Sequence, residues 1–215
     1  MWLYEFTLIQ KIVVAAVPVL FAVVLHEIAH GWTARSCGDN TAWQEGRLSL
    51  NPFKHIDPIG TVLVPILLLV TVGFAFGWAK PVPINWNNLR RPRRDMVLVA
   101  VAGPLANLCM AIFWALIYKL TTLLSGDIAL VMTQMSIIGL LVNVVLMVFN
   151  LLPLPPLDGG RIATSLLPYP WNAYLARVEP FGFFIILALL ATNSLSAIIS
   201  PAIRTIMNII LSVFI

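Results

Sequence analysis

Charged side chains are scarce in this sequence. Only 10% of its 215 residues are Asp, Glu, Lys or Arg, whereas a soluble domain usually carries about 25%. Hydrophobic residues make up 60% of the chain. This composition excludes an ordinary soluble globular protein, and the length allows several membrane helices of about 20 residues each.

Cysteine is almost absent, and positive charge is concentrated in one place. Cys37 and Cys109 are the two cysteines, and they stand outside any CxxC pattern, which excludes a disulfide framework and a cysteine-based metal site. The net charge is +4, but the stretch 90–94 contains four arginines. Such a cluster is typical of a cytoplasmic loop beside a membrane and lacks the interleaved aromatic residues of a nucleic-acid site. We therefore expect a lipid bilayer, and no nucleic acid, among the partners.

Long runs of apolar residues make up most of the sequence. Membrane helices are predicted over residues 6–34, 96–123 and 128–152. The apolar tail, 180–215, is expected to form one helix plus an interfacial one, or a hairpin. Residues 47–50 alternate polar and apolar, which predicts a short strand. The predicted fold is an all-α polytopic membrane protein, a bundle of about four to six membrane helices with a short β-strand or re-entrant element between the first helix and the arginine-rich loop.

Two of the three histidines stand four residues apart, with a glutamate directly after the first. On a helix, His26 and His30 share one face, so both imidazoles can reach one metal ion, and Glu27 can reach a water bound to it. Ionisable residues are costly inside a membrane helix and are usually functional there. The pattern predicts a zinc site of the metalloprotease kind. The alternative, a histidine pair hydrogen-bonded inside the bundle, does not explain Glu27.

A zinc site needs at least a third protein ligand, and a catalytic one leaves the fourth position to water. Asp158 is the first candidate, because it follows a long apolar helix and a proline-rich stretch at 153–156. Its alternative role is to cap a short helix over 158–167. His55 is the second candidate, but it lies in a polar loop. We therefore expect Asp158 to be the third ligand.

Three segments of the chain resemble one family when taken together. They are His-Glu-Ile-Ala-His at 26–30, Gly-Pro-Leu-Ala-Asn at 103–107, and Asn-Leu-Leu-Pro-Leu-Pro-Pro-Leu-Asp-Gly-Gly-Arg at 150–161. The combination resembles the site-2 protease family of intramembrane zinc metalloproteases, in its minimal prokaryotic branch without a PDZ or CBS domain. The resemblance extends over about residues 20–167.

The resemblance implies a role for six side chains and one zinc ion per chain. The metal ligands are His26, His30 and Asp158. The catalytic acid/base is Glu27. The candidates for stabilising the oxyanion or orienting the substrate are Asn150 and Asn107. Hydrogen bonding between helices, which is common in membranes, is the alternative role for both asparagines.

The three expected ligands constrain the topology. His26 and His30 lie near the end of the first helix, and Asp158 follows the helix 128–152, so these two helix ends must face the same side of the membrane. If 58–79 crossed the membrane, the ends would lie on opposite sides. We therefore predict that 58–79, which contains proline and glycine, is re-entrant. The basic residues then share one side, which is expected to be cytoplasmic and nearer the active site.

The expected function is hydrolysis of peptide bonds within or near transmembrane segments of substrate proteins, that is, regulated intramembrane proteolysis. One domain over 1–215 is predicted, with a core at about 6–167 and C-terminal helices at about 180–215. The expected substrate is a single-pass membrane protein in a prokaryotic cell membrane, and the sequence leaves open whether the chain forms a homo-oligomer.

Two other classes of protein remain as alternatives. A non-proteolytic zinc-binding protein or transporter would need more polar residues along a path through the bilayer. A prenyl-protein endopeptidase would need a distant glutamate as third ligand, and the surroundings of Glu179 do not fit that pattern.

A helical substrate must unwind before cleavage, because its amides are bonded within the helix. An extended edge of the enzyme can pair with the unwound segment. Residues 47–50 and 82–84 are the two candidate edges.

Overall fold

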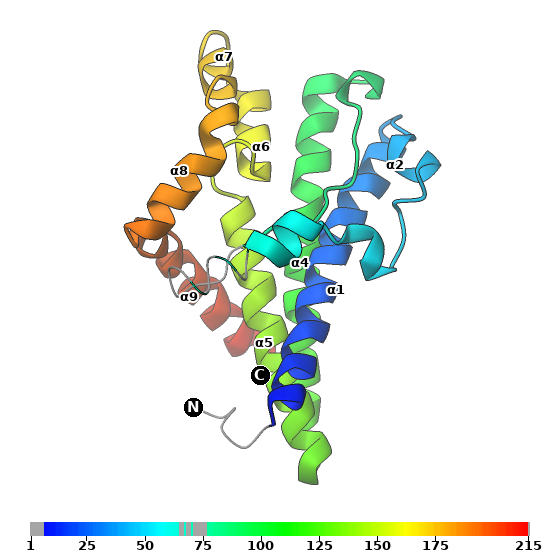
Figure 1. Cartoon of the computed structure of the whole chain (residues 1–215), viewed down its shortest axis with the longest axis vertical. Helices are drawn as coiled ribbons and strands as arrows, with labels where there is room; N and C mark the ends of the chain where they lie inside the picture. Colours follow the sequence, from blue (N-terminus) through cyan, green and yellow to red (C-terminus); the bar gives the residue numbers. More distant parts are fainter. Residues whose placement is uncertain (1–6, 65–66, 68–69, 71–76, 215) are drawn as a thin grey trace.

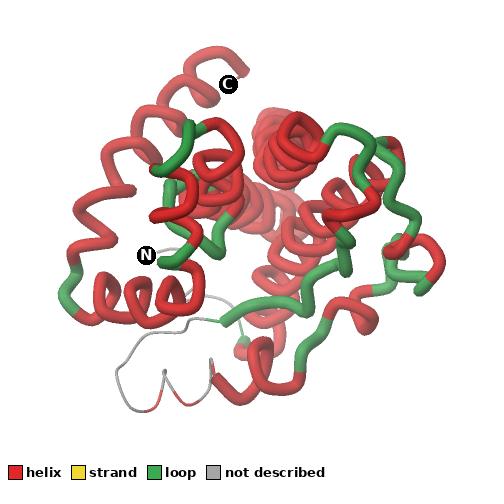
Figure 2. Tube along the Cα trace, turned by 90° about the horizontal axis from the view of Figure 1, so that it is seen from above, coloured by secondary structure: helices red, strands yellow, loops and turns green. Residues whose placement is uncertain are grey.

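The structure, a computed structural model, describes residues 7–64, 67, 70 and 77–214, which contain helices and loops and no β-strand (Figure 2). Within these residues, four helices are long and apolar enough to span a membrane: α1 (Leu8–Ser36), α4 (Pro92–Thr121), α5 (Gly126–Asn150) and α9 (Ser194–Phe214). The short elements between α1 and α4 are α2 (Thr41–Gln44), the 3₁₀ turn η2 (Pro52–His55), the π-helical turn η3 (Pro58–Leu63) and the 3₁₀ turn η4 (Trp86–Asn88). Those between α5 and α9 are α6 (Asp158–Leu166), α7 (Trp171–Ala176) and α8 (Glu179–Ala191).

Helices α1, α4 and α5 form the core of the bundle (Figure 1). In a membrane, helices associate by close packing, which favours small residues at their contacts. Gly139 on α5 is such a residue, because a side chain there would overlap the Trp114 indole of α4. Helix α9 lies against the same pair of helices and contributes Ile210 to their buried cluster. This packing fixes the direction of α5, and therefore the position of the segment that connects its C-terminal end to α6.

The chain runs up through α1, down through α4 and up again through α5 in the view of Figure 1. The backbone N–H of Arg90 donates to Cys37 O (3.1 Å), which joins the end of α1 to the start of α4. The C-terminal ends of α1 and α5 therefore lie at the same end of the bundle, as the ligand argument predicts.

Segment 58–79 begins and ends at one place. The N–H of Trp78 donates to Gly60 O (3.0 Å), and the hydroxyl of Thr61 donates to Trp78 O (2.9 Å). Since the hydrocarbon core of a bilayer is about 30 Å thick, two ends that hydrogen-bond to each other lie on the same side of it. These contacts agree with the prediction that segment 58–79 is re-entrant. Residues 65–66, 68–69 and 71–76 of this segment lie outside the described part of the chain.

The predicted strand at 47–50 is wrong, because these residues form a loop. The neighbouring stretch of chain contains Pro81 and Pro83, which have no N–H to donate to a ladder. Arg47 bonds to that stretch with its side chain instead, donating from Nη2 to Lys80 O (3.0 Å) and Pro81 O (3.2 Å). Leu48 lies against Gly31 on α1, but Leu50 is exposed and Arg47 is buried, so the alternation of polar and apolar residues does not correspond to one buried side.

Candidate active site

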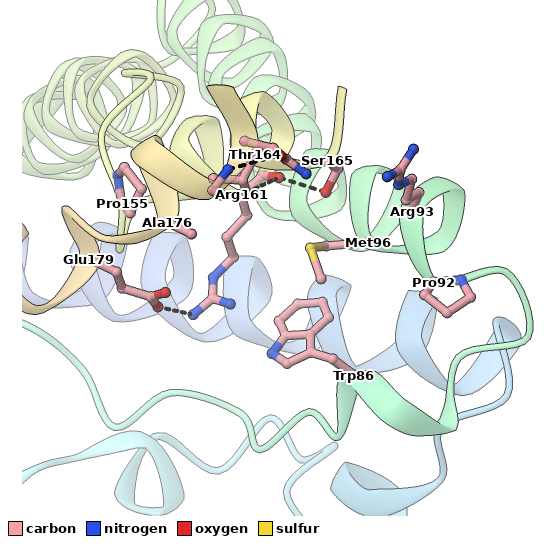
Figure 3. A pocket seen from close by; sticks show the side chains of 12 residues that line it. Trp86, Pro92, Arg93, Met96, Pro155, Arg161, Thr164, Ser165, Ala176 and Glu179 are labelled. Carbon is pink, nitrogen blue, oxygen red and sulfur yellow. Dashed lines mark hydrogen bonds and ion pairs between the residues drawn. The ribbon is translucent and has the colours of Figure 1, made fainter. Parts of the chain in front are cut away.

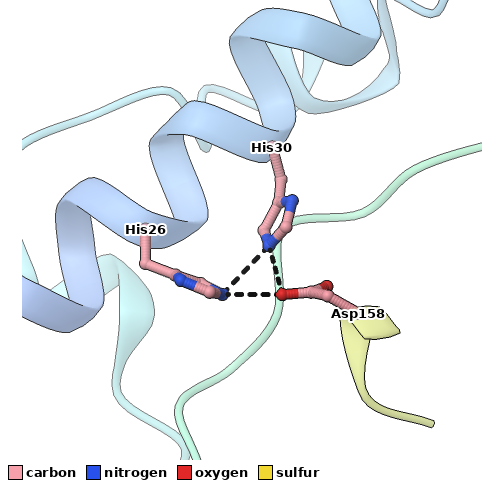
Figure 4. A group of neighbouring side chains, drawn as sticks. All are labelled: His26, His30 and Asp158. Atoms are coloured by element: carbon pink, nitrogen blue, oxygen red, sulfur yellow. Dashed lines mark hydrogen bonds and ion pairs between the residues drawn. The ribbon is translucent and has the colours of Figure 1, made fainter. Parts of the chain in front are cut away.

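Two imidazoles from the C-terminal half of α1 and one carboxylate from the start of α6 converge (Figure 4). The Nε2 atoms of His26 and His30 are 3.0 Å apart, and they lie 3.3 and 3.4 Å from Asp158 Oδ2. All three residues are buried. The structure therefore brings together the three residues that the sequence predicts as metal ligands, across more than 120 residues of chain.

Glycines allow the chain to approach the cluster from two directions. A side chain at Gly103 on α4 would overlap both imidazole rings, so only glycine lets α4 pass directly beside them. At the start of α6, a side chain at Gly160 would overlap the backbone of Pro155 in the preceding turn. Asp158 is the first residue of α6 and Leu157 is its cap, so the alternative capping role of Asp158 is not the one adopted.

One backbone carbonyl and one side-chain amide oxygen fix which nitrogen of each imidazole faces the cluster. Nδ1 of His30 lies 2.7 Å from Val99 O, and because a carbonyl can only accept, that Nδ1 carries the hydrogen. Nδ1 of His26 lies 2.6 Å from Asn107 Oδ1. The amide nitrogen of Asn107 is identified by its donation to Ala22 O (3.1 Å), so its oxygen accepts from His26. A ring with its hydrogen on Nδ1 alone carries a lone pair on Nε2, and both Nε2 atoms face Asp158.

These three donor atoms fit a zinc ion. Electron pairs held this close repel one another unless a cation lies between them. Ligands about 2.0–2.1 Å from a tetrahedral zinc lie about 3.3 Å from each other, close to the spacing found. Although burial acts to raise the pKa of the Asp158 carboxyl, hydrogen bonds and positive charge from the two imidazoles beside it lower that pKa to about 2. A cation held between the three side chains would favour the charged carboxylate in the same way, and a metal ligand must be charged.

A cavity of about 370 Å³ opens from the cluster. Glu27 and Asn150 line it together with the three candidate ligands. The Oε2 atom of Glu27 accepts from the backbone N–H of Val82 (2.8 Å), and Asn150 donates one of its two amide hydrogens to Leu146 O (3.0 Å). Five of the six predicted site residues thus face one space.

Asn107 is the sixth, and the structure places it behind the histidines. It is fully buried and is not part of the cavity wall. Its amide nitrogen donates to Ala22 O on α1 and to Asn143 Oδ1 on α5 (2.9 Å). The alternative role, hydrogen bonding between helices, is the one that Asn107 adopts. With both amide hydrogens used, it orients His26 and does not reach the site of an oxyanion.

His55, the second candidate for third ligand, lies away from the cluster. It is buried, and its Nε2 is 2.9 Å from Ser49 O. The preference for Asp158 over His55 agrees with this placement.

The comparisons with known proteins agree with this geometry. A family model described as "Peptidase family M50" matches residues 119–192. A Bacillus subtilis protein named "Putative zinc metalloprotease YwhC" is 38% identical over 204 residues, which cover 92% of this chain and 89% of that protein. The chain belongs to peptidase family M50, the site-2 protease family. As an M50 peptidase with apolar helices of membrane-spanning length, it is an integral membrane protein.

More distant M50 relatives are longer than this chain. A protein of Mycolicibacterium smegmatis named "Putative zinc metalloprotease Rip2" is 34% identical over 180 residues, 82% of this chain and 66% of that protein. The Rip2 protein of Mycobacterium tuberculosis is 30% identical over 178 residues, with the same coverage of both chains. No solved structure matches the chain significantly.

Sequence reasoning missed three residues that support the M50 site by contacting its side chains or the segments beside it. Val99 acts through its backbone carbonyl, which no sequence pattern reveals. Arg47 and Asn143 carry a weak signal, a lone arginine in a loop and a lone amide in an apolar helix. Neither signal indicates which partner the side chain contacts.

Proposed function

We propose that the protein is an intramembrane zinc metalloprotease that cleaves single-pass membrane proteins within or near their transmembrane segments, as in regulated intramembrane proteolysis. The observation that carries the proposal is the convergence of His26, His30 and Asp158 in one cavity with Glu27, inside a bundle of membrane helices. Two nitrogen donors and one oxygen donor form the ligand set of a catalytic zinc site with an open position. The zinc metalloprotease names of the relatives support the same metal. One ion per chain is part of the proposal.

The chain's own residues supply the proton transfers of the proposed reaction. His26, His30 and Asp158 would hold the zinc ion, which would lower the pKa of a bound water and polarise the scissile carbonyl. Glu27 accepts the water's proton and passes it to the leaving amine nitrogen. Because Oε2 already accepts from the Val82 N–H, we expect Oε1 to take this proton. The remaining amide hydrogen of Asn150 is the donor for the oxyanion.

The substrate is proposed to bind as an extended strand along residues 82–84. Val82 and Ile84 line the catalytic cavity, whereas residues 47–50 do not. Arg47 holds the preceding carbonyls, of Lys80 and Pro81, and the N–H of Asn85 donates to Asp39 Oδ2 (2.9 Å). Both ends of the edge are thereby fixed, which leaves Ile84 N–H as the donor for a substrate carbonyl.

The decisive experiment compares the purified wild type with Glu27→Gln. We expect the variant to keep its zinc, measured by mass spectrometry of the metal, because all three ligands remain. Cleavage of a reconstituted single-pass substrate should fall about 10²–10⁴-fold, since the variant lacks the general base. Asp158→Ala is the matched control and should lose zinc and cleavage together.

Two results would contradict the proposal. Equal cleavage by the wild type and Glu27→Gln would remove the glutamate from the mechanism. A zinc-loaded wild type that cleaves no substrate but carries zinc into sealed vesicles would favour the transporter alternative.

A further inference from the structure

A second cavity, of about 540 Å³, adjoins the catalytic one (Figure 3). It lies between the start of α4, the turn η4, and helices α6 and α7. Trp86 and Arg161 line both cavities, so the two spaces meet at these side chains. The outer cavity is also lined by Arg93 and Glu179.

Arg161 is fixed next to the metal cluster by the helix that carries it. It follows Asp158 by three residues on α6, and positions three apart lie on the same face of a helix. Its guanidinium lies 4.9 Å from the ring centre of Trp86. Among the described residues that line the catalytic cavity, Arg161 is the one Arg or Lys.

The ion pair of Arg161 with Glu179 is loose. Nη2 of Arg161 lies 3.6 Å from Glu179 Oε1, and half of the Glu179 side chain is exposed to solvent. A guanidinium has five N–H donors in a planar fork that matches the two oxygens of a carboxylate. Arg161 can therefore exchange Glu179 for another carboxylate.

Peptide hydrolysis creates such a carboxylate inside the cavity. Water adds across the C–N bond: the acyl fragment takes the hydroxyl and loses a proton, and the amine fragment leaves protonated. The new carboxylate would form at the metal, beside the carboxyl groups of Glu27 and Asp158. Arg161, the one Arg or Lys among the described residues of the cavity wall, offers it a cationic partner away from the metal.

We propose that Arg161 is the product-binding residue of the site. It binds the newly formed C-terminal carboxylate and draws it from the catalytic cavity into the outer one, while Glu179 competes for the same guanidinium and so promotes release. This inference rests on the proposed protease function. The ligand class it assigns to the Arg161 site is a peptide with a free C-terminal carboxylate.

The test measures binding directly, so that it does not depend on turnover. The probes are two fluorescent heptapeptides of alanine and leucine, one ending in a free acid and the other in an amide. Binding to the zinc-loaded full-length protein in detergent is followed by anisotropy. In the wild type we expect the acid to bind about tenfold more tightly than the amide.

Three variants separate the sources of that preference. Arg161→Gln should bring the acid-to-amide ratio close to one, and Arg161→Lys should restore part of it. Glu179→Gln should raise the ratio severalfold, because the competing anion is gone; this gain also serves as the test if Arg161→Gln fails to fold. A preference that persists unchanged in Arg161→Gln and Glu179→Gln arises from the metal and overturns the inference.

The outcome is distinct from that of the protease proposal. A wild type that fails to cleave its substrate, with an acid preference that still depends on Arg161, would contradict the proposed enzyme while leaving a carboxylate site. Normal cleavage without any acid preference would contradict the Arg161 inference alone.

Discussion

The side chain of Asn107 connects three helices at the scale of a single residue. From α4 it accepts a hydrogen bond from His26 on α1, and it donates to Ala22 O on α1 and to Asn143 on α5. Partners of this kind, which contact a ligand and not the metal, are typically worth 10–100-fold in metal affinity or activity. The sequence indicates that an amide inside an apolar helix needs partners, but not that one partner is a candidate metal ligand.

Asn107→Leu tests this role. The variant leaves Nδ1 of His26 without an acceptor, so zinc affinity should fall about 10–100-fold, measured by competition with a chelator of known affinity. Asn107→Asp is the matched control, because it keeps an oxygen for His26 and loses the two donated hydrogen bonds. Equal losses in both variants would show that Asn107 acts through helix packing alone.

At the scale of elements, the segment between residues 80 and 85 is held by side chains and not by a sheet. Arg47 bonds two of its carbonyls, Glu27 accepts its Val82 N–H, and Asp39 accepts its Asn85 N–H. The prolines that prevent a ladder with 47–50 also keep the segment extended. An extended segment fixed at both ends is preorganised for pairing with a substrate strand.

Ile84→Pro should weaken substrate binding more than Ile84→Ala. Both variants lose the isoleucine side chain, but only proline removes the N–H that the proposed pairing uses. Losing one hydrogen bond should raise KM about two- to tenfold, with zinc content unchanged. The measurement is cleavage of a reconstituted substrate at several concentrations. Identical KM values for the two variants would exclude backbone pairing at Ile84.

Some elements were predictable from sequence and others were not, for physical reasons. Periodic apolar runs predicted α1, α4 and α5 to within a few residues, because the bilayer itself sets their length. The tail, left open between two arrangements, forms α8 and α9, which turn at Asn193 with a positive φ of 56°. The strand at 47–50 failed because its pattern says nothing about whether a neighbouring edge can donate hydrogen bonds.

Some features of the candidate site were likewise predictable from sequence, and others were not. Helical spacing placed His26, Glu27 and His30 on adjoining faces without any tertiary information. The sequence favours Asp158 over His55 because Asp158 follows an apolar helix and a proline-rich stretch. The family resemblance supports that choice, since no local rule connects residues so far apart. The roles of Asn107 and Arg161 depend on what each side chain faces in the folded bundle, and so they became visible only in the structure.

At the scale of the whole molecule, the metal cluster and the arginine-rich stretch 90–94 lie toward the same end of the bundle. From the positive-inside rule, we propose that this end is cytoplasmic. Asn88 donates to Asp39 Oδ1 (2.9 Å), so the loop after α1 and the loop before α4 are neighbours on that side.

Single cysteines test this orientation. Asn40→Cys and Asn88→Cys, each in a chain whose Cys37 and Cys109 are replaced by serine, should both react with a membrane-impermeant maleimide in inverted prokaryotic membrane vesicles. Neither should react in intact cells, where only the outer face is accessible. Labelling of the two positions from opposite sides would mean that 58–79 crosses the bilayer.

Gly103 has a consequence beyond its own position. It supplies no ligand, no charge and no hydrogen-bonding side chain, yet it permits α4 to touch both imidazoles. A single added methyl group there would have to push apart the rings or the helices. The capacity to hold a metal thus depends partly on the absence of a side chain at Gly103. A substitution there can abolish activity although every donor atom remains.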